Sequence, residues 1–230
     1  MNVGIHQPNY LPWLGLFEKI DLSDIFVFYD NVQMPLNKSF VSRNAILANN
    51  KSLWLTVPIK RDGIKIINEV EISNQFWIKK HIKTIEHSYK FSQYFDEIMP
   101  IIYKTLNKEY KFISDLNIEL IISLWKCLGG EEKNFIRASK MNLTNNNYES
   151  IIEILELCKT KTYISGQGKG SLRYLDENYF KGKNIDIKLC SSEFSIYKQR
   201  SFSFIPNLSI IDSLFNIGPL KTLGLIRHEQ

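Results

Sequence analysis

The first thirty residues constrain the fold more than any other part of the chain. The segment "VGIHQ" (3–7) alternates apolar residues, "WLGLFEKIDLS" (13–23) spaces them at helical intervals, and "DIFVFYD" (24–30) is a continuous apolar run. A short apolar run flanked by polar residues is typical of a strand buried on both faces, as in a parallel sheet. Strand, helix and strand in this order form a βαβ unit, which predicts an α/β fold.

Further strand and helix patterns follow along the chain. The strand candidates are "SLWLTVPI" (52–59), "IKIINEVEIS" (64–73, a strand or an edge hairpin), "TYIS" (162–165) and "IDIKLCS" (185–191). Apolar residues have helical spacing at about residues 75–140 and again in "NNNYESIIEILELCKTK" (145–161). A last short helix is predicted to end at Gly218. The alternation predicts a single domain over residues 1–230, with a mostly parallel Rossmann-like sheet and a helical middle section as a subdomain at about 75–140.

Composition excludes several classes of protein. The 230 residues are 44% hydrophobic, enough for a substantial core, and the net charge of +5 is too small to favour nucleic acid, although it permits an anionic ligand. The three cysteines lie far apart without a CxxC pair, which disfavours a cysteine zinc site and suits a reducing cytoplasm. No run approaches the roughly 20 apolar residues of a membrane span, and no signal peptide is recognisable. We therefore expect a cytoplasmic protein without a membrane span.

Polar side chains gather where the predicted strands end. In open parallel α/β sheets, ligands bind at the carboxyl ends of the strands. The residues that follow the predicted strands are, in chain order, His6, Gln7, Asn9, Tyr10, Asp30, Asn31, Gln33, Lys38, Arg43, Asn44, Lys60, Ser165, Gly166 and Gly168. These positions predict a binding site along one edge of the sheet.

Two of these residues are candidates for acid–base chemistry, and each has a structural alternative. His6 either moves a proton or hydrogen-bonds a neighbouring backbone group. Asp30 is a general base or ligand anchor, unless it caps the turn that follows it. Lys38, Arg43 and Lys60 together are suited to clamp phosphates, although any one of them alone is more often a solvated surface charge. The glycines of "SGQGKGS" (165–171) let backbone N–H groups approach an anion. No pair of histidines has the i, i+4 spacing of a helical metal site, so no metal is expected.

Several motifs together resemble the WbqC-like protein family. They are, in chain order, "HQPNYLPWLGLFEKI", "DIFVFYDNVQ", "SRNAI", "WLTVPIK", "TYISGQG" and "LSIIDSLFNIG", and they span nearly the whole chain. With the resemblance, His6 and Asp30 become the catalytic candidates. The substrate-binding positions that it implies are Gln7, Asn9, Tyr10, Gln33, Arg43, Asn44, Lys60, Ser165, Gly166 and Asp212.

The resemblance implies a context in bacterial surface-polysaccharide synthesis, because family members are similar to proteins encoded among O-antigen, capsule and other glycoconjugate genes. We expect a transferase that modifies a nucleotide-linked amino sugar, by N-acyl or N-aminoacyl transfer. The donor, any cofactor and the formation of a homo-oligomer are left open.

Two other functions are left open. One is a non-catalytic binding partner of glycan-assembly enzymes. The other is a nucleotidyl or adenylyl transferase. The strand–loop–helix start is similar to that of nucleotidyltransferases of the HIGH class, but their two loop histidines would fall near Tyr10 and Trp13. The similarity therefore favours the architecture more than triphosphate chemistry.

Overall fold

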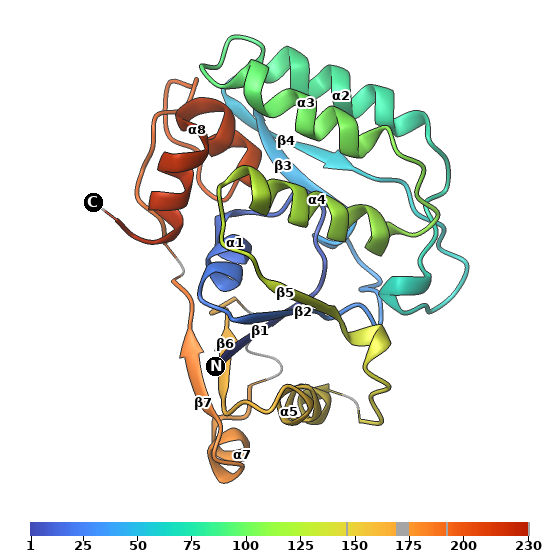
Figure 1. Cartoon of the computed structure of the whole chain (residues 1–230). Coiled ribbons are helices and arrows are strands. Elements are labelled where there is room, and N and C mark those ends of the chain that lie inside the picture. The colour runs from blue at the N-terminus through green and yellow to red at the C-terminus, as the bar shows by residue number, and fades with distance from the viewer. Residues whose placement is uncertain (146, 169–174, 192, 230) are drawn as a thin grey trace.

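A five-stranded parallel sheet forms the centre of the computed structural model, which describes residues 1–145, 147–168, 175–191 and 193–229 (Figure 1). Its strands are β1 (Asn2–His6), β2 (Ile25–Phe28), β5 (Asn134–Arg137), β6 (Thr162–Ser165) and β7 (Asp186–Leu189). They lie in the order β5-β2-β1-β6-β7, and every neighbouring pair is parallel. This is the order of the first five strands in a Rossmann fold, so the predicted α/β class is confirmed.

Helices cover both faces of this sheet (Figure 1). They are α1 (Leu14–Asp21) on one face, with α8 (Ile210–Ile226) packed against it, and α5 (Asn147–Leu157) and α7 (Glu177–Gly182) on the other. Successive residues of β2 point to opposite faces: Phe26 and Phe28 join the apolar cluster of α1 and α8, and Val27 joins the cluster of α5 and α7. The strand is buried on both faces, as its continuous apolar run predicts.

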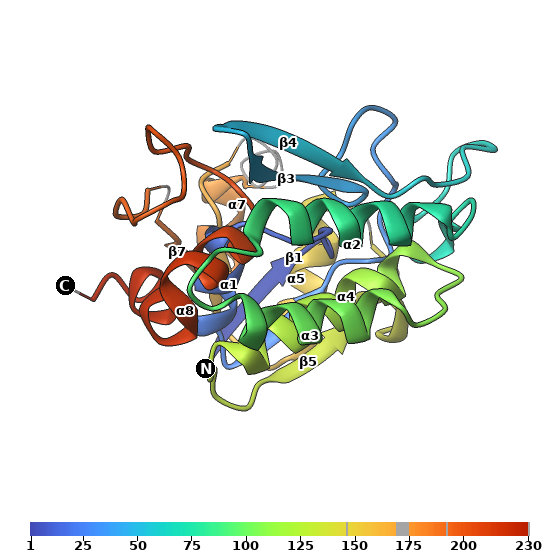
Figure 2. The ribbon, with the colours of Figure 1, turned by 90° about the horizontal axis from the view of Figure 1, so that it is seen from above.

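A hairpin and three long helices are inserted between β2 and β5. The inserted elements are β3 (Arg43–Ala48), β4 (Lys51–Thr56), the 3₁₀ turn η1 (Ile67–Glu69), α2 (Phe76–Tyr89), α3 (Phe95–Leu106) and α4 (Ile113–Cys127). Figure 2 shows α2 running between the β3–β4 hairpin and the α3–α4 pair. This is the predicted helical middle section. Its last helix ends at Cys127 rather than near residue 140, because β5 and a second 3₁₀ turn, η2 (Ala138–Lys140), follow.

Some segments differ from the predicted strands. Residues 52–59 do not join the parallel sheet, because β4 pairs antiparallel with β3. The turn between them has φ values of 49° at Asn49 and 60° at Asn50, the left-handed pair that a two-residue hairpin requires. Residues 64–73 form η1 and isolated bridges instead of a strand. The hairpin therefore takes up residues that the sequence alone places in the main sheet.

α8 bends at Gly218, the residue at which the sequence predicts the end of a helix. Gly218 has a φ of 82°, and a Cβ atom there would lie 2.5 Å from the ring of Tyr94, so glycine is required on both counts. Beyond the bend the helix continues from Pro219 to Ile226. Even with this extension, no helix in the described part of the chain is long and apolar enough to cross a membrane.

Candidate functional site

The carboxyl ends of β1 and β6, which we call the switch point, form the best-placed candidate site. The chain runs from β1 outward to β2 and β5 on one side of the sheet, and from β6 to β7 on the other. Open α/β sheets bind ligands where the strand order reverses in this way. Gly4 pairs with Ile164, so the register places His6 level with Gly166. The fold thus brings together the predicted residues at the ends of these two strands.

The His6 ring is fixed by its neighbour in the chain. Its Nδ1 lies 2.8 Å from the carbonyl oxygen of Gln7, and because a carbonyl only accepts, Nδ1 carries the hydrogen. In the neutral ring, Nε2 is then the nitrogen with a free electron pair. Burial and the nearby charge of Lys19 lower the pKa of His6 to about 3, so the ring is neutral near pH 7. The ring has the tautomer of a proton acceptor, but a group with this pKa is a weak base.

A buried lysine, absent from the sequence prediction, lies close to His6. Lys19 is 2% exposed, and its Nζ donates a 3.1 Å hydrogen bond to the carbonyl oxygen of Ile5 near the end of β1. Its side chain passes over Gly4, where a Cβ atom would lie 3.1 Å from Lys19 Cγ. Burial lowers the pKa of Lys19 to about 8. The sequence carries no signal for this burial, because a lysine on a short amphipathic helix is ordinarily a surface residue.

Cys190 is a further polar neighbour of Lys19, and Glu18 lies near Cys190. Cys190 follows β7, and burial raises the pKa of its thiol to about 11, so it is not a thiolate near pH 7. The Glu18 carboxylate accepts at Oε1 from the Ser191 amide (2.8 Å) and from Nε2 of His228 (3.2 Å). Its Oε2 is buried and has no hydrogen-bond partner among the described residues.

Buried amides and an aromatic pair hold the loop after β1. Asn44 and Asn117 donate to carbonyl oxygens of this loop at 2.7 and 2.8 Å. Tyr10 has no exposed surface, and its hydroxyl lies 2.9 Å from Nδ1 of His81 on α2. Asn9 is 7% exposed. In the structure, Tyr10 and Asn44 therefore contact the protein itself and shape the loop.

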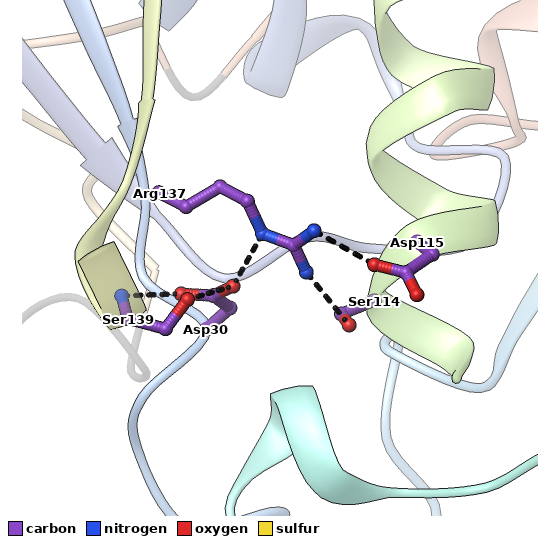
Figure 3. Close-up of polar contacts among 5 residues, drawn as sticks. All are labelled: Asp30, Ser114, Asp115, Arg137 and Ser139. Atoms are coloured by element: carbon purple, nitrogen blue, oxygen red, sulfur yellow. Dashed lines mark hydrogen bonds and ion pairs between the residues drawn. The ribbon is translucent and has the colours of Figure 1, made fainter. Parts of the chain in front are cut away.

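Asp30 lies in a polar cluster that joins β2, β5 and α4 (Figure 3). Its carboxylate is fully buried and accepts from Nε of Arg137 (2.9 Å), the Ser139 amide (2.8 Å) and the Ser139 hydroxyl (2.9 Å). The other guanidinium nitrogens of Arg137 donate to Asp115 (2.7 Å) and Ser114 (3.1 Å). Both oxygens of Asp30 are occupied by Arg137 and Ser139, which is a structural arrangement. It differs from the predicted cap of the following turn, because the partners lie 107 and 109 residues later in the chain.

Besides Asn44, three predicted binding residues belong to the insertion rather than to the carboxyl edge of the main sheet. Gln33 is exposed, the Arg43 guanidinium lies 4.0 Å over the ring of Trp54, and Lys60 pairs with Glu71 at 2.6 Å. Lys60 also lines a surface hollow of about 370 Å³. It follows β4, an antiparallel strand of the hairpin, so the rule that selected it does not apply to it.

Asp212 in the first turn of α8 is buried in a network of its own. It accepts from the hydroxyls of Tyr89 (2.9 Å) and Tyr197 (2.7 Å) and from Nε2 of Gln199 (2.8 Å). Burial raises the pKa of its carboxyl. The network ties α8 to α2 and to the segment before α8, which is a structural arrangement.

The glycine-rich segment 165–171 is described as far as Gly168, and its residues 169–171 lie outside the described residues. Ser165 is fully buried at the end of β6, and Gln167 donates from Nε2 to the carbonyl oxygen of Cys190 at 2.8 Å. Within the described residues, no group of three or more His, Cys, Asp and Glu side chains is arranged to hold a metal ion.

Comparison with known proteins places the chain in a family. Residues 7–223 match the model of the WbqC-like protein family. The chain is 30% identical over 222 residues to the uncharacterized protein Rv1507c of Mycobacterium tuberculosis (strain ATCC 25618 / H37Rv), covering 94% of each protein. A search of solved structures found no match. The chain belongs to the WbqC-like protein family.

Proposed function

We propose that the protein transfers an acyl or aminoacyl group to the amine of a nucleotide-linked sugar in bacterial surface-polysaccharide biosynthesis. The observation that carries this proposal is the switch point, where a Rossmann-type strand order brings His6 and Gln7 beside Ser165 and Gly166. The genetic context that the family resemblance implies favours a sugar precursor as the substrate. The fold supports a nucleotide-containing ligand, and the family resemblance supports a role in surface-polysaccharide synthesis.

The transfer requires a proton acceptor and a carbonyl activated for attack. The sugar nitrogen, after losing the proton of its ammonium form, attacks the carbonyl carbon of an activated acyl donor. The amide bond forms, and the leaving group departs with the electron pair of the broken bond. Nε2 of His6 is the acceptor that we assign to the ammonium proton, and Gln7 and Asn9 are the donors that we assign to the developing oxyanion.

An anionic substrate makes His6 a better base. The pKa of His6 is lowered first by burial and second by the positive charge of Lys19. A diphosphate beside Lys19 offsets the second of these causes, so the pKa of His6 rises when the substrate is in place. The proposal thus couples the binding of the nucleotide to the basicity of the ring.

The test combines binding and product formation. Each UDP- or dTDP-linked amino sugar of a panel is added to the protein, and the melting temperature is measured. Sugars that raise it are then incubated with acyl and aminoacyl donors, and the product is detected by mass spectrometry. We expect His6→Gln to lose about 100-fold or more in rate, whereas His87→Gln, at an exposed position on α2, keeps the wild-type rate.

Two results would count against this function. If no nucleotide-linked sugar raises the melting temperature and no pair gives a product, the transferase proposal fails. Release of pyrophosphate from ATP in the presence of magnesium would instead support the nucleotidyl or adenylyl transferase alternative.

A specific observation favours the non-catalytic alternative as a second candidate. Four predicted site residues, Asp30, Tyr10, Asn44 and Asp212, are buried in contacts with the protein itself. A binding module needs a shaped surface and no base. If His6→Gln binds the sugar nucleotide as well as the wild type and restores polysaccharide synthesis in cells, the binding role is the correct one.

A further inference from the structure

We propose that Lys19 binds a phosphate group of the ligand at the switch point. This inference rests on the proposed function insofar as the ligand is a nucleotide-linked sugar. The inference assigns the role of phosphate-binding cation to Lys19, which lies near the end of β1, instead of to Lys60 and Arg43, which lie in the insertion.

The argument begins with a buried ammonium that has unused donors. Lys19 is 2% exposed, and the hydrogen bond of its Nζ goes to the carbonyl oxygen of Ile5. An ammonium has three N–H donors, so two remain. Burying a charged ammonium costs several kcal/mol unless a counter-charge and further hydrogen bonds offset the cost. The free protein therefore holds a cation that is incompletely compensated.

The groups around Lys19 do not supply a counter-ion. His6 is a neutral ring, and the thiol of Cys190 is protonated near pH 7. Glu18, the preceding residue on α1, accepts at Oε1 from Ser191 and His228, and its buried Oε2 has no hydrogen-bond partner among the described residues. Within the described residues, no carboxylate lies within 4.0 Å of Lys19 Nζ.

Two lysines nearer the surface have a carboxylate partner. Lys60, which is exposed, pairs with Glu71 at 2.6 Å, and Lys65, which is partly exposed, pairs with Asp62 at 2.8 Å. Lys19 is almost completely removed from water and has no such partner among the described residues. A ligand that carries negative charge supplies the counter-charge that the described protein does not.

The position of Lys19 points to phosphate as the anion. Its Nζ lies against the last residues of β1, at the edge where Rossmann-type sheets bind the phosphates of nucleotides. Gly4 leaves room for the lysine stem to reach this edge, because a Cβ atom there would lie 3.1 Å from Lys19 Cγ. An ammonium with two free donors suits a tetrahedral oxyanion, which offers several acceptors in a small volume.

The test compares two lysines that are changed to the same apolar residue. Lys19→Met keeps the unbranched shape of the side chain, shortens it by one atom and removes the charge, and Lys79→Met does the same at an exposed position on α2. The probes are UDP, dTDP and inorganic pyrophosphate, with affinity measured by calorimetry. We expect Lys19→Met to weaken UDP binding about 10- to 100-fold and Lys79→Met to leave it unchanged. Without a probe, Lys19→Met should melt no lower than the wild type, because methionine buries no charge.

A second measurement uses the wild-type protein, so it does not depend on a variant that folds. Lysines are labelled with an amine-reactive reagent, with and without UDP, over a time course long enough for the 2% exposed Lys19 to react, and the modified peptides are quantified by mass spectrometry. Binding of UDP should slow the labelling of Lys19 and leave the labelling of Lys79 unchanged.

The outcomes separate this proposal from the proposed function. Wild-type affinity for UDP in Lys19→Met, equal labelling of Lys19 with and without bound UDP, or no binding of any probe to the wild type would each overturn the role of Lys19. If UDP binding depends on Lys19 but no donor gives a product, the phosphate site stands and the transferase function fails. If Lys19→Met forms product as efficiently as the wild type, the function stands and the phosphate site fails.

Discussion

Single side chains near the carboxyl edge differ in how much of their hydrogen-bonding capacity the fold already uses. The Asp30 carboxylate receives three hydrogen bonds from Arg137 and Ser139, whereas the Lys19 ammonium donates to the carbonyl oxygen of Ile5. A group whose capacity is filled stabilises the fold, and a group with capacity left is available to a ligand. The two residues therefore call for different experiments.

The pair of Asp30 and Arg137 is expected to stabilise the fold as a unit. Arg137→Met should lower the free energy of unfolding by about 3 kcal/mol, because the buried carboxylate keeps its charge and loses its cation. Adding Asp30→Asn to Arg137→Met removes that charge, so the double variant should cost about 1–2 kcal/mol less than the sum of the single variants. Urea unfolding measures all three. Costs that add within about 0.5 kcal/mol would show that the two side chains are not coupled.

At this scale the sequence identifies positions but not partners. Because Asp30 follows an apolar strand, the sequence indicates a general base. The partner of its carboxylate, Arg137, lies 107 residues later in the chain and cannot be recognised from the local sequence. Tyr10 reads as a ligand contact, yet its partner His81 is 71 residues away. The sequence gives no signal for the burial of Lys19, because this burial depends on elements that are distant in the chain, such as the segment around Cys190.

Among the elements, α1 and β1 approach each other closely at Gly4. A Cβ atom at this position would lie 2.2 Å from the hydroxyl oxygen of Ser23 and 3.1 Å from the ring of Phe26. The missing side chain lets the end of α1 lie against the strand, and it leaves the path along which Lys19 reaches Ile5. The glycine therefore supports both the packing and the candidate site.

Gly4→Ala should lower the free energy of unfolding by about 1–3 kcal/mol, because the new methyl group overlaps the Ser23 hydroxyl. Ser23→Ala in the same chain removes that oxygen and should recover part of the loss. Gly182→Ala is the matched control, since a Cβ atom there meets nothing within 4 Å. Thermal denaturation followed by circular dichroism measures the series. If Gly4→Ala and Gly182→Ala melt at the same temperature, the close contact carries no energetic weight.

Elements with a long or doubly buried pattern are predictable from this sequence, and short ones are not. The apolar run of β2 and the helical spacing of α2 and α4 each fix their element locally. β5 has four residues, too few to show a period, and β3 is recognised only through its turn and its partner β4. Strand pairing depends on residues distant in sequence. The sequence therefore does not reveal that the strand predicted at residues 52–59 pairs in the hairpin and not in the main sheet.

For the whole molecule, the stability of the fold should decrease in mild acid. His6 and His81 have pKa values of about 3 and about 4 in the folded chain, chiefly because they are buried, and about 6.5 when unfolded. Between these values the unfolded chain binds more protons than the folded one, so acid favours unfolding. For each histidine, the free energy of unfolding should fall by about 1.4 kcal/mol per pH unit as the pH falls from 6.5 towards 4. Above pH 6.5 this loss is absent.

Urea unfolding of the wild type, His81→Gln and His87→Gln at several pH values tests this expectation. His81→Gln should reduce the slope by about 1.4 kcal/mol per pH unit, and His87→Gln, at an exposed position, should not. Asp212, whose pKa is raised in the folded chain, acts in the opposite sense: its contribution is present below its unfolded pKa and is lost as the pH rises. The same slope in His81→Gln and the wild type would contradict the prediction.

The central position of β1 has a consequence for the synthesis of the chain. Val3 pairs with Tyr163, 160 residues later, so one edge of the first strand stays open while most of the polypeptide is still being translated. At about 5–20 residues per second, this interval lasts about 10–30 s on the ribosome. A nascent or truncated chain that ends before β6 exposes an apolar strand with an unpaired edge, the kind of surface that aggregates or engages chaperones.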